Sequence, residues 1–92
     1  MVKVQLNIIW NVVDRQTNIL DERTAEKLIY MPCCPFIGME ITVCTKDKSA
    51  CADGVVTEVC YNESHDFIDV YLADDDIRDA AMVDKILENG WK

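Results

Sequence analysis

The chain has 92 residues, of which half are hydrophobic and 28% are charged, and it carries a formal net charge of −8. This length fits a single domain, and three glycines and two prolines are too few for a linker or a disordered tail. The acidic charge disfavours direct nucleic-acid binding, because phosphates need a basic face. Charges interrupt every apolar run before the ~18 residues that a membrane span requires, so we also expect no membrane binding.

The N-terminal segment, residues 2–13, alternates apolar and polar side chains, which is typical of a strand with one buried face. The apolar set comprises Val2, Val4, Leu6, Ile8, Trp10 and Val12. Ile9 and Val13 interrupt the opposite, polar face, so that face also needs cover from the helix, from another strand layer or from a second copy of the chain. Because the single helix is expected on the first face, we predict a two-fold homodimer with Ile9 and Val13 at its contact.

A polar turn leads into residues 19–30, which we interpret as a second strand in a long hairpin with the first. The alternative is a helix over residues 21–30, which contain good helix formers. Pro32 and Pro35 then end the pairing, because neither can donate a hydrogen bond to a ladder. Three further strands are predicted over residues 36–44, 55–61 and 67–72.

The C-terminal segment, residues 75–89, predicts an amphipathic helix with Asp74 or Asp75 as its N-cap. Its apolar stripe contains Ile77, Ala80, Val83 and Leu87, flanked by Ile86. Gly90 stands where a helix commonly ends, and we expect Trp91 to fold back onto the sheet.

Five strands followed by one helix indicate an α+β fold, either a five-stranded antiparallel sheet or a small barrel closed by the C-terminal helix. The barrel interpretation depends on three segments, Phe36-Ile-Gly-Met-Glu-Ile, Gly54-Val-Val-Thr-Glu-Val-Cys-Tyr and Phe67-Ile-Asp-Val-Tyr-Leu. Their strand rhythm resembles that of small SH3-like barrels over less than half of the chain. The resemblance implies a fold and no activity, since such barrels host many unrelated functions.

The five cysteines and the single histidine lack the Cys-x₂₋₄-Cys spacing on which most structural zinc sites rest. An odd number of cysteines favours five free thiols in a reducing cytoplasm. Cys33 and Cys34, between two prolines, form either a rigid loop or a redox-active pair. His65 and Asp66 follow Cys60 closely, but they are more typical of a solvated turn than of a catalytic site. We predict no catalytic residue, no metal site and no cofactor.

The acidic surplus lies entirely in the second half of the chain. Residues 1–50 hold six basic and six acidic residues, whereas residues 51–92 hold three basic and eleven acidic ones, a difference of −8. Solubility and helix capping explain such a surplus in the simplest way. The more specific hypothesis is a docking face for a basic protein partner. Its predicted contacts are Asp69, Asp74, Asp75, Asp76 and Asp79.

Two classes of function fit these features. The first is a small cytoplasmic, non-enzymatic interaction module of adaptor or inhibitor type, which binds a protein partner through its acidic half. The alternative is a small-molecule or metal sensor that uses the barrel mouth and the Cys33–Cys34 loop. Glu58 and Asp69 are predicted to point outward on neighbouring strands, where they fit a solvated sheet face better than a pair of catalytic acids.

Overall fold

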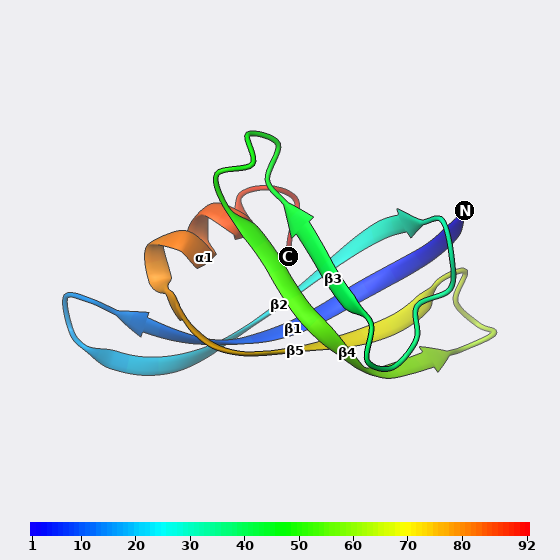
Figure 1. The fold of residues 1–92 in the computed structure, drawn as a ribbon, viewed down its shortest axis with the longest axis horizontal. Helices are drawn as coiled ribbons and strands as arrows, with labels where there is room; N and C mark the ends of the chain where they lie inside the picture. Colours follow the sequence, from blue (N-terminus) through cyan, green and yellow to red (C-terminus); the bar gives the residue numbers. More distant parts are fainter.

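A computed structural model shows one sheet and one short helix, and it describes residues 1–92 except for the side chain of Asp75. The elements are β1 (Val2–Asp14), β2 (Ile19–Met31), β3 (Glu40–Cys44), β4 (Cys51–Tyr61), β5 (Ile68–Asp79) and α1 (Ala80–Leu87). The strands lie in the order β2-β1-β5-β4-β3. β1 and β5 are parallel, and the other three neighbouring pairs are antiparallel. The fold is therefore α+β, as predicted, with a mixed sheet (Figure 1).

The predicted antiparallel sheet and closed barrel are wrong, because β3 does not pair with β2. Pro32 and Pro35 cannot donate to a ladder, so the pairing of β2 ends at Met31, and the chain leaves before β3 begins. The strands still alternate in direction along the chain. The fifth strand therefore runs parallel to the first and adds to the free side of β1. β2 and β3 remain as the two edges of an open sheet.

β1 confirms the predicted alternation. The face that we call inner carries Val4, Leu6, Ile8, Trp10 and Val12, all of them buried. The same core includes Val83 and Ile86 of α1 and Ile41, Ala52 and Val56 of the β3–β4 hairpin. Figure 1 shows this hairpin crossing over the long β1, β2 and β5 strands. The helix and the hairpin thus cover the inner face, and the opposite, outer face of β1 stays open.

The C-terminal residues fold back onto the sheet, as predicted. Trp91 is buried and packs against Trp10, with ring centroids 5.9 Å apart. The next residue, Lys92, exchanges two backbone hydrogen bonds of 2.9 and 3.0 Å with Glu26 of the β2 edge. This bridge partly blocks an edge that is otherwise free to pair with another strand.

The boundary between β5 and α1 differs from the prediction. β5 continues to Asp79, so the acidic run predicted at the helix start lies in a strand, and the helix spans only residues 80–87. Asp79, not Asp74 or Asp75, is the N-cap, and its side chain accepts a hydrogen bond from the N–H of Ala81. Ile77, predicted to face the core, is 63% exposed. The cause is the length of β1, whose residues 11–13 pair with residues 77–79 and keep β5 extended.

The β3–β4 hairpin is more compact than predicted, since β3 begins at Glu40 and β4 already begins at Cys51. The Asp47 carboxylate closes its turn by accepting hydrogen bonds from Thr45 and Ser49. Further along β4, a Cβ at Gly54 would lie 2.9 Å from the carbonyl oxygen of Ala73. Only glycine therefore allows the backbones of β4 and β5 to approach this closely.

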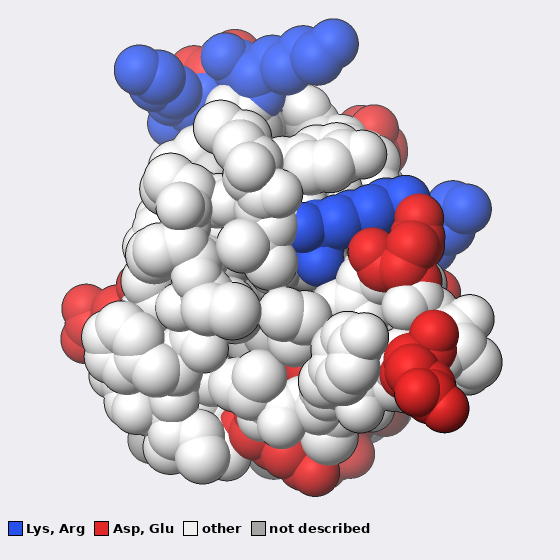
Figure 2. Space-filling view, turned by 90° about the vertical axis from the view of Figure 1, so that its right-hand side faces the viewer, with Lys and Arg blue, Asp and Glu red and all other residues white. Residues whose placement is uncertain are grey.

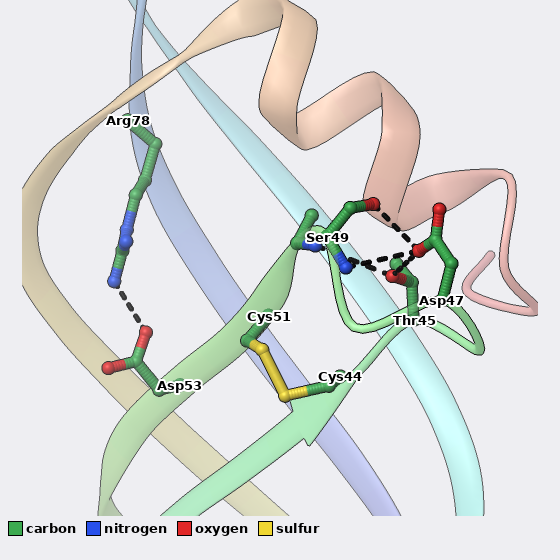
Figure 3. Close-up of a disulfide and its surroundings, with 8 residues drawn as sticks. Cys44, Thr45, Asp47, Ser49, Cys51, Asp53 and Arg78 are labelled. Carbon is green, nitrogen blue, oxygen red and sulfur yellow. Dashed lines mark hydrogen bonds and ion pairs between the residues drawn. A yellow bond between two sulfur atoms is a disulfide. The ribbon is translucent and has the colours of Figure 1, made fainter.

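The prediction of five free thiols is wrong, because Cys44 and Cys51 form a disulfide across the hairpin (Figure 3). The two cysteines are direct partners in the β3–β4 register, which brings their side chains together. Cys33, Cys34 and Cys60 are free. The cytoplasmic location thereby loses one of its supports and stays a prediction. Within the described residues, no helix has the length and apolar character needed to cross a membrane.

Candidate functional site

The acidic residues predicted to bind a partner do not form one exposed surface. Asp74 is paired with Arg78 at 2.7 Å, and its side chain is only 6% exposed. Asp79 pairs with Arg15 at 3.0 Å while it caps α1. Asp76 is exposed, with a carboxylate oxygen 4.0 Å from Arg78. The side chain of Asp75 lies outside the described residues.

Arg78 neutralises much of the charge in this part of β5. Besides Asp74, its guanidinium contacts Asp53 of β4 at 2.5 Å (Figure 3). The hydrogen bond to Asp74 is the main cause that raises the pKa of Arg78. The described acids around Arg78 are thus largely committed to the fold. Asp69, near the start of β5, belongs to a different part of the surface.

A groove of about 590 Å³ crosses the outer face of the sheet from β2 to β4. Its volume falls within the range of pockets that bind small molecules. Its lining comprises Asn7, Ile8 and Ile9 of β1, Thr24, Ala25 and Glu26 of β2, Thr57 and Glu58 of β4, Tyr71, Leu72, Ala73 and Asp74 of β5, and Lys92.

The strand register explains how the groove is built. One row across the four strands reads Glu26, Asn7, Tyr71 and Glu58, so two carboxylates flank an amide and a phenol. The next row reads Thr24, Ile9, Ala73 and Val55, which is mostly apolar. The register shifts between residues 9 and 11 of β1 and between residues 56 and 58 of β4. Such bulges bend and twist a sheet, which accounts for the hollow.

The floor of the groove is accessible to a partner. Ile9 is 54% exposed and Tyr71 is 41% exposed, although both lie in the middle of a four-strand surface. Ile9 and Val13 were predicted to interrupt the polar face of β1, and Ile9 does point outward. The homodimer inferred from these two residues stays a prediction.

Carboxylates set the electrostatics of this surface. The charge of Asp69 is the main cause that raises the pKa of Tyr71. The thiol of Cys60 donates a hydrogen bond of 3.3 Å to Glu58, and this bond is the main cause that raises the pKa of Cys60. The shift of Tyr71 reflects the negative charge that carboxylates place where β4 and β5 meet. Of the described lining residues, Lys92 alone is basic.

Amide side chains of β1 hold the carboxylates of Glu26 and Asp69 in place. The amide of Gln5 donates to Glu26 at 3.1 Å, and the amide of Asn7 donates to Asp69 at 3.4 Å. Glu58 and Asp69 lie on neighbouring strands and on the same face, as predicted. Asp69 lies beside the groove. Among the described ion pairs it has no basic partner, in contrast to Asp74, Asp76 and Asp79 of the predicted contact set.

The other candidate residues lie apart from the groove or lack partners for chemistry. His65 stacks on Phe67 with ring centroids 4.8 Å apart, in the turn between β4 and β5. Cys33 and Cys34 are exposed in the connection between β2 and β3. Among the residues that the structure describes, no three Cys, His, Asp or Glu side chains are grouped to hold a metal ion.

No protein-family model, curated protein or solved structure matches this chain. The groove is the strongest basis for a functional proposal, because it brings two carboxylates and an accessible aromatic ring together on one face. Sequence reasoning missed it because its members come from four strands. Two signals pointed toward it, namely the apolar Ile9 on a polar face and the outward acids Glu58 and Asp69.

Proposed function

We propose that the protein is a non-enzymatic interaction module that binds a basic segment of a partner protein in the outer-face groove. The row Glu26, Asn7, Tyr71 and Glu58 is the observation that carries this proposal. It sets two carboxylates on either side of an accessible aromatic ring. The acidic interaction predicted from the sequence is retained, and its centre moves from the start of α1 to the middle of the sheet.

The chemistry of the groove favours a segment in which lysine or arginine flanks an apolar residue. Ile9 and Tyr71 offer apolar contact, and an aromatic face also attracts a cation. Glu26 and Glu58 project from opposite sides of the row and can each pair with one basic side chain. Asp69 extends the negative potential beyond Tyr71. A second copy of this chain, with its net charge of −8, is a poor occupant of the same groove.

A binding role fits this surface better than a catalytic one. Cys60 carries a thiol beside the row, opposite Asp69 in the β4–β5 register, and the hydrogen bond to Glu58 raises the pKa of this thiol. A raised pKa disfavours the thiolate, which is the reactive form. The carboxylate that approaches Cys60 therefore suppresses nucleophilic chemistry.

Selection from a random peptide library displayed on phage tests the proposal. We expect enriched peptides to carry two or more lysines or arginines around an apolar residue. Their affinity, measured by fluorescence polarisation, should fall steeply with added salt because the contacts are exposed. Enrichment of acidic peptides, or affinity that salt leaves unchanged, contradicts the proposal.

Charge-matched variants locate the binding surface. Glu58→Gln should weaken an enriched peptide about five-fold, which corresponds to about 1 kcal/mol. Glu63→Gln removes the same charge from the β4–β5 turn, outside the groove, and should leave the affinity nearly unchanged. Equal losses in the two variants would show that net charge, and not the groove, causes the binding.

The alternative function, a sensor based on the Cys33–Cys34 loop, has one supporting observation, which is that both thiols are exposed. The open sheet offers no barrel mouth for a ligand. Native mass spectrometry with Cu(I) or Zn(II) separates the two proposals. A stoichiometric adduct that is lost in a Cys33→Ser, Cys34→Ser double variant would favour the sensor.

A further inference from the structure

We propose that two copies of the chain associate through the apolar end of the molecule, which we define as Tyr30, Phe36, Ile37 and Tyr61. These side chains are between 60% and 75% exposed. They come from the end of β2, from the connection between β2 and β3, and from the end of β4. This proposal is independent of the groove, and it moves self-association away from Ile9 and Val13.

The connection that carries Phe36 and Ile37 is held in place by the fold. Pro35 is buried, and the N–H of Gly38 donates to the carbonyl of Val56 at 2.9 Å. The N–H of Val56 in turn donates to the carbonyl of Met39 at 2.8 Å. The apolar side chains of this segment are thus presented on a backbone that β4 anchors. A preformed surface loses little conformational entropy when it binds.

Charged side chains are sparse on this end. Figure 2 faces it directly and shows a broad uncharged field, which one basic side chain with an acidic side chain beside it enters from the right, while most other charged side chains lie toward the margins. The ion pair between Lys3 and Asp66, 3.0 Å apart, belongs to the same end and neutralises itself. Exposed apolar patches with charged rims commonly mark protein interfaces.

The charge distribution favours a second copy as the occupant. The molecule measures 44 × 25 × 22 Å, and the apolar end lies at one extreme of its long axis (Figures 1 and 2). The second half of β5, with Asp74, Asp76 and Asp79, runs toward the other extreme and leads into α1. Arg78 and Arg15 pair with these acids, but residues 74–88 still hold six acidic and only two basic residues. An end-to-end dimer places these segments of the two chains at opposite extremes, farther apart than the Debye length of ~8 Å.

Other contacts between two copies bring like charges together. A dimer through Ile9 would place the carboxylates of one groove against those of the other. An anionic lipid surface is also a poor partner for the apolar end, because the whole chain is strongly acidic. The end-to-end arrangement leaves both grooves open, so self-association and partner binding are compatible.

Sedimentation velocity from low to high micromolar protein tests the proposal. We expect the average mass to rise from 10.5 kDa toward twice that value. Ile37→Asp should abolish the rise, because it places a charge in the contact. Ile19→Asp is the matched control, since Ile19 is similarly exposed at the opposite end and its replacement should leave the dimer intact.

Chemical crosslinking gives a second readout that depends on geometry. In a variant with Cys34→Ser and Cys60→Ser, Cys33 is the only free thiol, and a short bismaleimide should link two copies through it. Adding Ile37→Asp should remove this crosslink. Circular dichroism shows whether each variant is folded.

Three outcomes overturn the proposal: a wild-type chain that stays monomeric at every concentration, equal effects of Ile37→Asp and Ile19→Asp, or a dimer that only Ile9→Asp disrupts.

Discussion

The two faces of β1 divide the molecule into a part that stabilises the fold and a part that is free to bind. The inner face holds five apolar side chains that are almost completely inaccessible, and α1, Trp91 and the β3–β4 hairpin cover it. The outer face carries Lys3, three amides and the apolar Ile9 and Val13, and nothing described in the chain covers Ile9. One strand thus carries two different surfaces, because successive side chains point to opposite sides.

The difference between the two faces shows which surface of a small domain can carry binding residues. A domain of this size has only a few kcal/mol of net stability, so its core side chains cannot be exchanged for functional ones. The outer face contributes less to stability, and two bulges have hollowed it. The groove therefore lies on the face that the fold does not need to bury.

The largest expected effect tests this division directly. Trp10→Ala should cost about 3–5 kcal/mol of the free energy of unfolding, because it leaves a cavity beside Trp91. Ile9→Ala, on the adjacent residue, should change this free energy by less than about 0.5 kcal/mol. Urea denaturation followed by circular dichroism measures both values.

If Trp10→Ala does not fold, Trp10→Phe provides a milder change. It should still lower the free energy of unfolding more than Ile9→Ala does. A loss in Ile9→Ala as large as in Trp10→Phe would show that the outer face is buried, by a second copy or otherwise.

The difference between the two faces of β1 could be predicted from the sequence, because it depends on the alternation of apolar and polar residues along one strand. Residues 2–13 show a period of two over their whole length, and the short turn after them dictates an antiparallel partner. Trp91 could be predicted as well, since a large apolar residue after a helix end needs a buried position. These features involve neighbours in the chain or a single apolar side chain.

The end of β5 could not be predicted, because it depends on pairing with a distant strand. Aspartate is rare in strands and common at helix N-caps, so Asp74–Asp76 indicated a helix start. The register with β1 and the ion pairs of Arg78 keep this segment extended instead. The groove has the same origin, since Asn7 and Tyr71 become neighbours only through the parallel β1–β5 pair.

The disulfide was missed for a related reason. Counting cysteines says nothing about register, and the hairpin places Cys44 opposite Cys51 only because its turn is shorter than the polar segment suggested. Three hydrogen bonds from Thr45 and Ser49 to Asp47 define that turn. Side-chain bonds within a turn offer the backbone an alternative to the strand ladder, and a count of cysteines carries no information about them.

A change of intermediate size removes the disulfide from the hairpin that covers the inner face. Cys44→Ser with Cys51→Ser should lower the free energy of unfolding by about 2–3 kcal/mol, because the closed loop is short. The double variant Cys33→Ser, Cys34→Ser serves as the control, since both residues are exposed, and its stability should be close to that of the wild type.

Titration of the unfolded, unreduced wild-type chain with a thiol reagent checks the same bond. It should find three reactive thiols, those of Cys33, Cys34 and Cys60. Five reactive thiols would show that the hairpin covers the inner face without a covalent link.

The smallest effect concerns the turn of the same hairpin and its dependence on pH. Hydrogen bonds from Ser49 and Thr45 lower the pKa of Asp47 well below its ordinary value of 3.8. Its folded-state pKa is below its unfolded-state pKa, so the stabilisation is fully present above pH 3.8 and is lost as the pH falls toward the lowered value. Asp47→Asn should therefore flatten the acid side of the stability profile. Glu63→Gln, in the β4–β5 turn, removes a carboxylate for which no hydrogen bond or ion pair is described, and it should leave this profile unchanged. Thermal melts between pH 2 and pH 6 measure the slope for each variant.

Because Asp47 is exposed, salt screens its contact with Lys85 at 3.8 Å, whereas the bonds from Ser49 and Thr45 persist. The difference between Asp47→Asn and the wild type should thus survive at high salt. A difference that disappears with salt would assign the effect to Lys85 and leave the turn without a role in holding the hairpin over the inner face.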